Sequence, residues 1–437
     1  MAIRYHGQPK RRQPCHVRRP VATHSACKRT NRRWPNARKG KMIPGDASAI
    51  AARLMSEFAM RTGLLQAAQH LQRYLWTDAF AVCNFLELFA RTSDQTHRRC
   101  AMELIDQVHQ VLGRYRDDDI RSGWISGFDE QTGRHHPTAG GLRIGKPLKE
   151  RDADEPLDER LEWDRDGQYF HYLTKWMHAL CQAGFATGNI AYVRWAVELG
   201  QAAFAGFTRR AASGRVIGLH WKMSIDLSRP LVAAMGMHDA LDGFITFREL
   251  QHAATMSSDA GANDLSEATR SLAALCQDRD WMTDDPLGIG GLLFDACRLV
   301  RLIDEERYGD LRLLESLLDA CHHGLAVFLA GGSLNASASQ RLAFRELGLA
   351  IGLRGLPILA DAMKTIKGYG RGPALQQLLE PLLRYGSLGE GLVNFWLPHA
   401  QHDQSWKAHE DINDVMLATA LTPELFLSTG ERTPFAS

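Results

Sequence analysis

Residues 281–294 read WMTDDPLGIGGLLF, and the interpretation of the whole fold depends on the pattern in this stretch. A tryptophan is followed by two acids, then by Pro286, and then by an apolar segment rich in glycine. Aspartate is favoured just before a helix, and proline is favoured in the first helical turn. A helix that is apolar on most sides is normally buried. The stretch therefore predicts a buried helix over residues 286–302.

The same mark, a tryptophan followed within a few residues by acid, recurs along the chain. Its copies stand at Trp76, Trp163, Trp221, Trp281 and Trp406. From Trp163 to Trp221 is 58 residues, and from Trp221 to Trp281 is 60. The interval from Trp281 to Trp406 is 125 residues, about two such units, and residues 341–346 lie near its middle as a degenerate copy. Evenly spaced copies indicate six repeated supersecondary units.

The apolar residues of the chain recur at helical spacing, and strand signals are nearly absent. Twelve principal helices are expected at residues 48–72, 76–92, 97–115, 166–183, 189–212, 224–236, 238–256, 286–302, 307–330, 341–354, 374–385 and 409–421. The helices that follow the marks are the more apolar, and those between them carry more charge. Six buried and six amphipathic helices in alternation predict an all-α fold, an (α/α)6 barrel or toroid of six helical hairpins. Its inner helices run parallel, so their N-termini gather in one cup.

The charge of the chain is divided unevenly. Residues 1–41 carry 13 of the 52 Lys and Arg residues and no Asp or Glu, so the remainder holds 39 basic and 50 acidic residues. We expect residues 1–41 to be a disordered basic tail and residues 42–437 to be a single barrel domain. An unstructured leader, or an upstream start before Met42, is favoured over an arm that binds nucleic acid.

Other features of the sequence indicate the cellular compartment in which the protein works. The basic N-terminus has no apolar segment of the kind found in a signal peptide, and no apolar run approaches the length of a membrane span. Eight cysteines are scattered without CxxC spacing. These features predict a cytoplasmic protein that works away from the membrane, without a bound metal or other cofactor. The oligomeric state is left open.

The helix alternation, the unit length and the Trp/Asp-rich starts of the inner helices resemble the six-hairpin glycosidase superfamily over about residues 45–425. The resemblance implies an (α/α)6 toroid with a carbohydrate substrate. The superfamily includes inverting glycoside hydrolases, glycoside phosphorylases, unsaturated-uronyl hydrolases and, on a similar barrel, sugar epimerases and isomerases. A fold by itself does not choose among these activities.

Inverting hydrolysis needs a carboxylic acid and a carboxylate on opposite sides of the bond, roughly 6.5–9.5 Å apart. Acids at separate inner-helix starts meet this need, which neighbours on one helix do not. The expected acid–base residues are Asp166 and one of Asp284 and Asp285, with Glu410 in reserve. The function predicted first is therefore glycoside hydrolysis of a small sugar.

The walls of the cup are expected to bind the sugar, because indole faces suit the stacking of sugar rings. The expected binding residues are Trp76, Asp78, Arg143, Trp163, Asp164, Gln168, Tyr169, His171, His220, Trp221, Trp281 and His409. A long loop over about residues 116–162 leads into the Trp163 segment, and we expect it to fold over the cup as a lid. Arg143 and Lys146 would then meet an anionic group of the substrate, although a solvated loop is the simpler interpretation.

Two other classes of function stay open. A sugar epimerase or isomerase needs a base beside a carbonyl, commonly histidine, and His220 and His409 are the best-placed pair. A non-catalytic sugar-binding or scaffold protein would keep the barrel without the chemistry. Acids that face each other across the cup would favour hydrolysis, and facing histidines would favour isomerisation.

Overall fold

The computed structural model describes residues 44–65, 71–256, 265–303, 308–364, 372–400 and 402–430. The basic segment at residues 1–41 lies outside this range, so its predicted disorder stays a prediction. Among the described residues, helices dominate and five very short strands lie between them.

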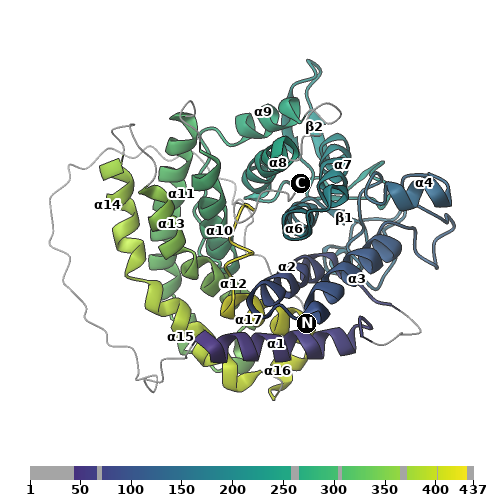
Figure 1. Ribbon diagram of the computed structural model, residues 1–437. Helices are drawn as coiled ribbons and strands as arrows, with labels where there is room; N and C mark the ends of the chain where they lie inside the picture. The colour runs from purple at the N-terminus through teal and green to yellow at the C-terminus, as the bar shows by residue number, and fades with distance from the viewer. Residues whose placement is uncertain are drawn as a thin grey trace.

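The described helices form two concentric rings (Figure 1). The inner ring consists of α2 (Leu75–Thr92), α6 (Phe170–Thr187), α8 (Asp239–Met256), α10 (Pro286–Leu302), α12 (Ala343–Arg354) and α17 (Glu410–Leu421). Each inner helix packs against the next, and α17 returns to α2, so the ring is closed. This arrangement confirms the predicted (α/α)6 toroid.

The outer helices cover the inner ring (Figure 1). They are α1 (Pro44–Arg61), α3 (Gln95–Leu112), α7 (Ile190–Phe207), α9 (Ser266–Leu275), α11 (Tyr308–Ala330) and α15 (Gly386–Trp396). Two further helices, α13 (Leu356–Met363) and α14 (Gly372–Leu383), link α12 to α15 along the side of α11 and α10. Short helices α4 (Glu130–His135), α5 (Glu159–Glu162) and α16 (Gln404–Lys407) lie in connections.

Local sequence explains where these helices begin and how closely they pack. Asp285 accepts a hydrogen bond from the Gly288 amide at 3.0 Å, and Pro286 fills the first turn of α10, as predicted. A Cβ added to Gly290 of α10 would lie 2.2 Å from the Gly348 carbonyl oxygen of α12. A Cβ on Gly352 would meet the Gly290 carbonyl oxygen at 2.6 Å. Glycine therefore allows these two inner helices to approach backbone to backbone.

The prediction of an inner helix after Trp221 is wrong. Residues 224–236 are not helical, and the inner helix of this unit is α8, for which the sequence predicts an outer position. Strands β1 (Gln168–Tyr169), β4 (Lys222–Met223) and β5 (Pro230–Val232) form a small antiparallel sheet there, and β2 (Thr208–Arg210) pairs with β3 (Val216–Leu219). The buried side chains Met223 and Ile225 alternate with polar ones, and this period of two belongs to extended chain.

The segment after α17 runs into the ring (Figure 1). The Phe426 ring is stacked between Phe80 and Phe294, with centroids 4.3 and 4.4 Å away. The Phe426 carbonyl oxygen lies 2.9 Å from Nε2 of His178, and Gln182 donates to the Ser428 carbonyl oxygen at 3.0 Å. Residues 423–430 therefore fill the axis below the cup, and Phe426 forms its floor.

One described helix, α11, is long and apolar enough over Asp310–Ala330 to cross a membrane, judged by length and composition alone. The sequence-based expectation that no such run exists therefore needs correction. The window is 44% buried, and the helix packs against α10 and α14 as an outer helix of the barrel. The same length and composition occur in core helices, so this finding is weak evidence for a membrane span.

Candidate active site

Aromatic side chains from the starts of α2 and α6, from the end of α5 and from the small sheet and its flank gather at the N-terminal end of the inner ring. This aromatic arc consists of Tyr74, Trp76, Trp163, Tyr169, His171, Tyr172 and Trp221. Tyr74, Trp163, His171, Tyr172 and Trp221 are partly exposed, so the arc presents ring faces and edges to solvent.

The contacts within the arc are continuous. The Trp221 ring lies 5.2 Å from Trp163 and 5.0 Å from Tyr169 between centroids, and it is stacked on His171 at 6.3 Å. His171 is 4.9 Å from Tyr172 in an edge contact. The hydroxyl oxygens of Tyr172 and Tyr74 lie 2.6 Å apart. Five predicted binding residues, Trp76, Trp163, Tyr169, His171 and Trp221, are thus brought together on one wall.

An acid–base pair lies beside this wall. Nδ1 of His171 lies 3.7 Å from Oδ1 of Asp239, at the start of the neighbouring inner helix α8. Burial raises the pKa of Asp239 to about 7, although a hydrogen bond from the Gly236 amide favours the ionised form. Burial lowers the pKa of His171 to about 4, and the charge of Lys175 adds to this effect. Near neutral pH the site therefore holds a protonatable carboxyl beside a neutral imidazole.

Below this pair, a network of charged side chains continues down the barrel axis. Asp242, one turn below Asp239, accepts from Lys175 at 2.7 Å and from Arg298 at 2.9 Å. Burial opposes the ionisation of Asp242, but the charges of Lys175 and Arg298 outweigh it and lower its pKa to about 2. Arg298 also donates to Asp295 at 2.7 Å and to Glu249 at 3.0 Å.

Asp242 and Asp239 therefore lie on one helix with opposite pKa shifts. Pairs of titratable groups with separated pKa values are typical of acid–base sites. The lower network is closed at its base by His178, which bonds Glu249 at 2.8 Å and the Phe426 carbonyl oxygen.

Asp166, the first predicted catalytic acid, is fully buried and has partners on both oxygens. Its Oδ2 accepts from Arg143 at 2.8 Å, and its Oδ1 accepts from the Gly145 amide at 2.9 Å. Arg143 also donates to the carbonyl oxygens of Arg114 and Val111, so it does not extend toward a substrate. These contacts correct the expected roles of Asp166 and Arg143, because they anchor the loop.

Gln168 has a similar anchoring role. Its side chain accepts from the Leu142 amide at 2.9 Å and donates to the Ile225 carbonyl oxygen at 2.6 Å. With no exposed surface, it binds the loop to the small sheet, and the expectation that it contacts the substrate is corrected.

The long connection between α3 and α6 covers less of the cup than predicted. Helix α4 packs on the outer side, where Thr138 donates to the Trp195 carbonyl oxygen of α7 at 2.8 Å. Other stretches of the connection contact the cup end: the Leu75 amide, at the start of α2, donates to the Ile144 carbonyl oxygen at 3.1 Å, and the Ile225 amide donates to Glu150 at 2.6 Å.

The other predicted acids lie at helix starts. Asp284 is exposed, and Asp285 caps α10 while it pairs with Arg345 of α12. Glu410 begins α17 and lies 3.8 Å from Nε of Arg61. These contacts fit capping and ion pairing, which are common for acids at helix N-termini.

Asp78 and Asp164 differ in burial. Asp78 accepts from the Tyr74 amide at 3.0 Å and lies 3.7 Å from Arg73, and burial raises its pKa to about 6. Asp164 is exposed beside Trp163. Asp78 therefore mainly closes the first turn of α2, although it remains a carboxyl with a raised pKa near the arc.

The two histidines predicted as an alternative pair are both partly buried, at separate places. His220 follows strand β3, and its amide donates to the Phe207 carbonyl oxygen at 2.8 Å. His409 precedes α17, with its ring 5.9 Å from Phe344. Burial lowers the pKa of both. Among the described residues the two rings share no contact, and His171 with Asp239 is the pair that the fold brings together.

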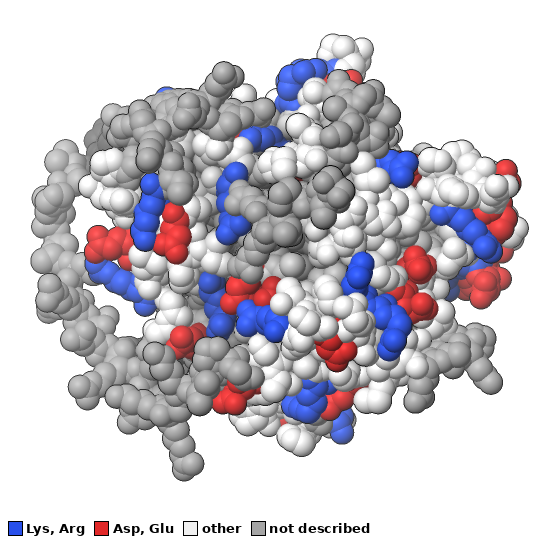
Figure 2. Space-filling model, viewed as in Figure 1, with Lys and Arg blue, Asp and Glu red and all other residues white. Residues whose placement is uncertain are grey.

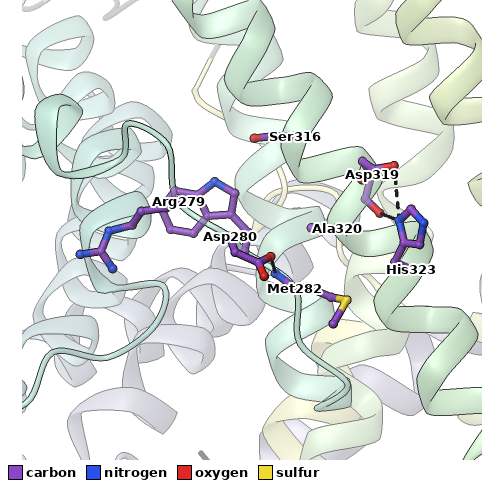
Figure 3. Close-up of a pocket in the computed structure, with 8 residues that line it drawn as sticks. Arg279, Asp280, Met282, Ser316, Asp319, Ala320 and His323 are labelled. Carbon is purple, nitrogen blue, oxygen red and sulfur yellow. Dashed lines mark hydrogen bonds and ion pairs between the residues drawn. The ribbon is translucent and has the colours of Figure 1, made fainter. Parts of the chain in front are cut away.

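Trp281, a predicted wall residue, is 2% exposed, and its carbonyl oxygen lies 3.2 Å from Nε2 of His238. It lines a hollow of about 210 Å³ between residues 279–282 and α11, where His323 and Asp319 interact (Figure 3). None of the arc residues lines this hollow. Trp281 therefore contacts His238, the neighbour of Asp239, with ring centroids 6.3 Å apart, and lines a hollow that the arc does not share.

Several site residues are missed by the sequence-based prediction: Tyr74, Tyr172, Lys175, His238, Asp239, Asp242, Asp295 and Arg298. Asp239 and Asp242 lie on α8, which has no tryptophan mark directly before it, and Lys175, Asp295 and Arg298 lie one or more turns inside α6 and α10. The spacing His171, Lys175, His178 and Gln182 on α6 is a usable signal, because it places polar groups along one helix face.

Groups of three or more His, Cys, Asp or Glu residues suited to a metal are not found within the described part of the chain. On the face shown in Figure 2, the visible Lys/Arg and Asp/Glu side chains are interspersed. Within the described residues, this face therefore carries no large patch of purely positive or purely negative charge.

No protein-family model matches the chain, and no curated protein matches its sequence. Among solved structures, a GH76 alpha-mannanase from Bacteroides thetaiotaomicron matches with a TM-score of 0.50 and 10% identity, over 88% of this chain and 99% of the mannanase. A cellobiose 2-epimerase from Spirochaeta thermophila matches with a TM-score of 0.45 and 13% identity, over 86% and 98% of the two chains.

A third match is an unsaturated glucuronyl hydrolase from Bacillus sp. GL1, with a TM-score of 0.30 and 14% identity over 65% of this chain and 84% of that one. At these identities the likeness concerns the fold alone. The protein has the six-hairpin glycosidase-like (α/α)6 fold.

Proposed function

We propose that the protein is a carbohydrate-active enzyme that binds a sugar against the aromatic arc and transfers a proton through Asp239 and His171. The observation that carries this proposal is the placement of a carboxyl with a pKa of about 7 beside a partly exposed wall of aromatic rings. A general acid or base works best when its pKa lies near the working pH. Aromatic faces are the surfaces on which sugar rings stack.

Glycoside hydrolysis is the reaction that we propose first. A leaving glycosidic oxygen needs a proton, and Asp239 is a carboxylic acid that still holds its proton close to neutral pH. The fold is shared with an alpha-mannanase, which supports a carbohydrate substrate without identifying it. The second carboxylate would come from another inner-helix start, and Asp78 and Glu410 are the candidates.

Epimerisation or isomerisation is the second candidate reaction. His171 supports it, because its imidazole is in the protonation state that a general base needs. Its pKa of about 4 keeps the imidazole neutral at pH 7, and the side chain is 28% exposed while its buried Nδ1 lies 3.7 Å from Oδ1 of Asp239. A neutral imidazole that stacks on Trp221 in the arc is placed to remove a proton from a bound sugar.

The test is a screen of aryl glycosides and free disaccharides, followed by Asp239→Asn and His171→Gln. Asp239→Asn should lower kcat by roughly 100-fold or more, because a positioned general acid typically contributes 10²–10⁴. Asp117→Asn is the matched control, since Asp117 is an exposed acid of the loop between α3 and α6. Full activity of Asp239→Asn on a confirmed substrate would contradict the assignment.

Deuterium oxide separates the two reactions. Epimerisation beside a carbonyl exchanges a carbon-bound hydrogen with solvent, and NMR of the sugar detects that exchange, whereas hydrolysis leaves the carbon-bound hydrogens in place. Exchange that depends on His171 would favour epimerisation over hydrolysis. Release of a free reducing sugar without exchange would favour hydrolysis.

A further inference from the structure

Lys146 enters the mouth of the cup from the loop that leads to α6. Its ammonium nitrogen lies 5.4 Å from the centroid of the Tyr74 ring, at one end of the aromatic arc. The side chain is partly buried. Burial lowers the pKa of the amine, while the charges of Asp164 and Asp166 oppose this effect. The fold thus places a cation directly beside the proposed sugar wall.

The backbone around Lys146 is held on several sides. The Lys146 carbonyl oxygen accepts from Arg116 at 2.6 Å. The Gly145 amide donates to Asp166, and Gly145 has a φ of 90°, where a Cβ would lie 2.0 Å from the Arg73 carbonyl oxygen. This position therefore requires glycine, and the lysine that follows it is presented from a fixed point.

The other cations near this region have anionic partners. Lys175 donates to Asp242 at 2.7 Å, and Arg143 donates to Asp166 at 2.8 Å. Lys222 is fully buried and lies 2.8 Å from Glu162. Lys146 has no carboxylate within ion-pair distance among the residues that the structure describes. The charges of Asp164 and Asp166 act on Lys146 only from beyond ion-pair distance, so a ligand anion in direct contact would offset the cost of burying this cation.

We propose that Lys146 binds an acidic group of the substrate, so that the enzyme prefers an anionic sugar such as a uronate over the neutral sugar with the same ring. This inference rests on the proposed function, because it takes the aromatic arc as the sugar wall. Lys146 would pair with the carboxylate while the ring of the sugar lies against the arc. It is a specificity-determining residue and takes no part in proton transfer.

The test uses D-glucuronate and D-glucose as probes, with binding followed by tryptophan fluorescence, since Trp163 and Trp221 lie in the arc, and by calorimetry. The native protein should bind glucuronate more tightly than glucose. Lys146→Met should weaken glucuronate binding on the order of 10-fold or more, because a charge-assisted hydrogen bond is lost, and should leave glucose binding unchanged.

Lys149→Met is the matched control. Lys149 lies three residues further along the same loop, is 59% exposed and pairs with Asp152 at 3.4 Å. Lys149→Met should leave the affinities for glucuronate and for glucose unchanged. Lys146→Arg should retain part of the preference for glucuronate, because the charge is kept. The melting temperature of Lys146→Met should not fall, because a desolvated cation is removed from a partly buried place.

The outcomes separate this inference from the proposed function. Equal binding of both sugars, an equal loss of both in Lys146→Met, or no binding of glucuronate at all would overturn the role of Lys146. Activity that survives in Asp239→Asn on a confirmed substrate would overturn the proposed proton transfer and leave a Lys146-dependent preference standing. A lower melting temperature with unchanged sugar preference would show that Lys146 acts only in folding.

Discussion

Replacement of Asp239 by asparagine should make the protein more stable at alkaline pH while it removes activity. The pKa of this carboxyl is raised from 3.8 to about 7 in the folded protein. Below pH 3.8 the group is neutral in both the folded and the unfolded state, so it does not disfavour folding. As the pH rises to about 7, the unfolded chain releases the proton first, and the folded state loses relative stability.

The magnitude follows from the two pKa values. One pKa unit corresponds to 1.36 kcal/mol, so native Asp239 lowers the free energy of unfolding by about 1.5 kcal/mol at pH 5 and by about 4 kcal/mol at pH 8. Asparagine has the same shape, can still accept from the Gly236 amide and does not titrate. The stability gained by Asp239→Asn should therefore grow with pH and level off above pH 7.

Urea denaturation of the native protein and of Asp239→Asn at pH 5 and pH 8 measures this difference. Asp164→Asn serves as the control, because that side chain is exposed and should give the same small effect at both pH values. An equal effect of Asp239→Asn at pH 5 and pH 8 would refute the reasoning. Asp239 would then be ionised in the folded protein at neutral pH and would be unsuited to donate a proton.

Two further replacements test the floor of the cup and the anchor of the loop. Phe426→Ala should lower the free energy of unfolding by about 3–5 kcal/mol, because it removes a buried ring stacked on Phe80 and Phe294. Urea denaturation measures this change, and a loss below about 1 kcal/mol would show that the barrel axis is loosely packed. Asp166→Ala should also lower the free energy of unfolding by about 3–5 kcal/mol, because Arg143 keeps its buried charge without this carboxylate. Unchanged stability together with lost turnover would instead support Asp166 as a catalytic acid.

The sequence predicts the ring itself well, because capping and helical periodicity are local properties. Asp285 and Pro286 mark the start of α10, and the aromatic and acidic residues around Trp163 are enough to identify the wall of the cup. The same local reasoning fails for residues 224–236, where apolar residues that alternate along an extended chain also fit a short helix. Because of that error, the third inner helix is predicted too early in the chain, and Asp239, at the true start of this helix, is not predicted as a site residue.

Long-range contacts explain the remaining errors. Asp166 follows a tryptophan and looks like a site residue, but its partner Arg143 lies 23 residues earlier in a loop whose path is not fixed by any local pattern. Arg298 likewise reaches Asp242 and Glu249 only once α8 and α10 lie side by side. Burial of this kind depends on the whole ring, so the pKa values that distinguish Asp239 and Asp242 do not follow from sequence.

Closure of the ring between α17 and α2 has a consequence for synthesis of the chain. Asn84 of α2 donates to the Val415 carbonyl oxygen at 3.0 Å and accepts from Thr419, which lies 335 residues later. At roughly 5–20 residues per second, α2 leaves the ribosome about 15 to 70 s before its partner exists. During that time the buried face of α2, with a polar amide in it, is exposed in the cell. Nascent chains of this protein should therefore depend on a holding chaperone until residue 430 has emerged.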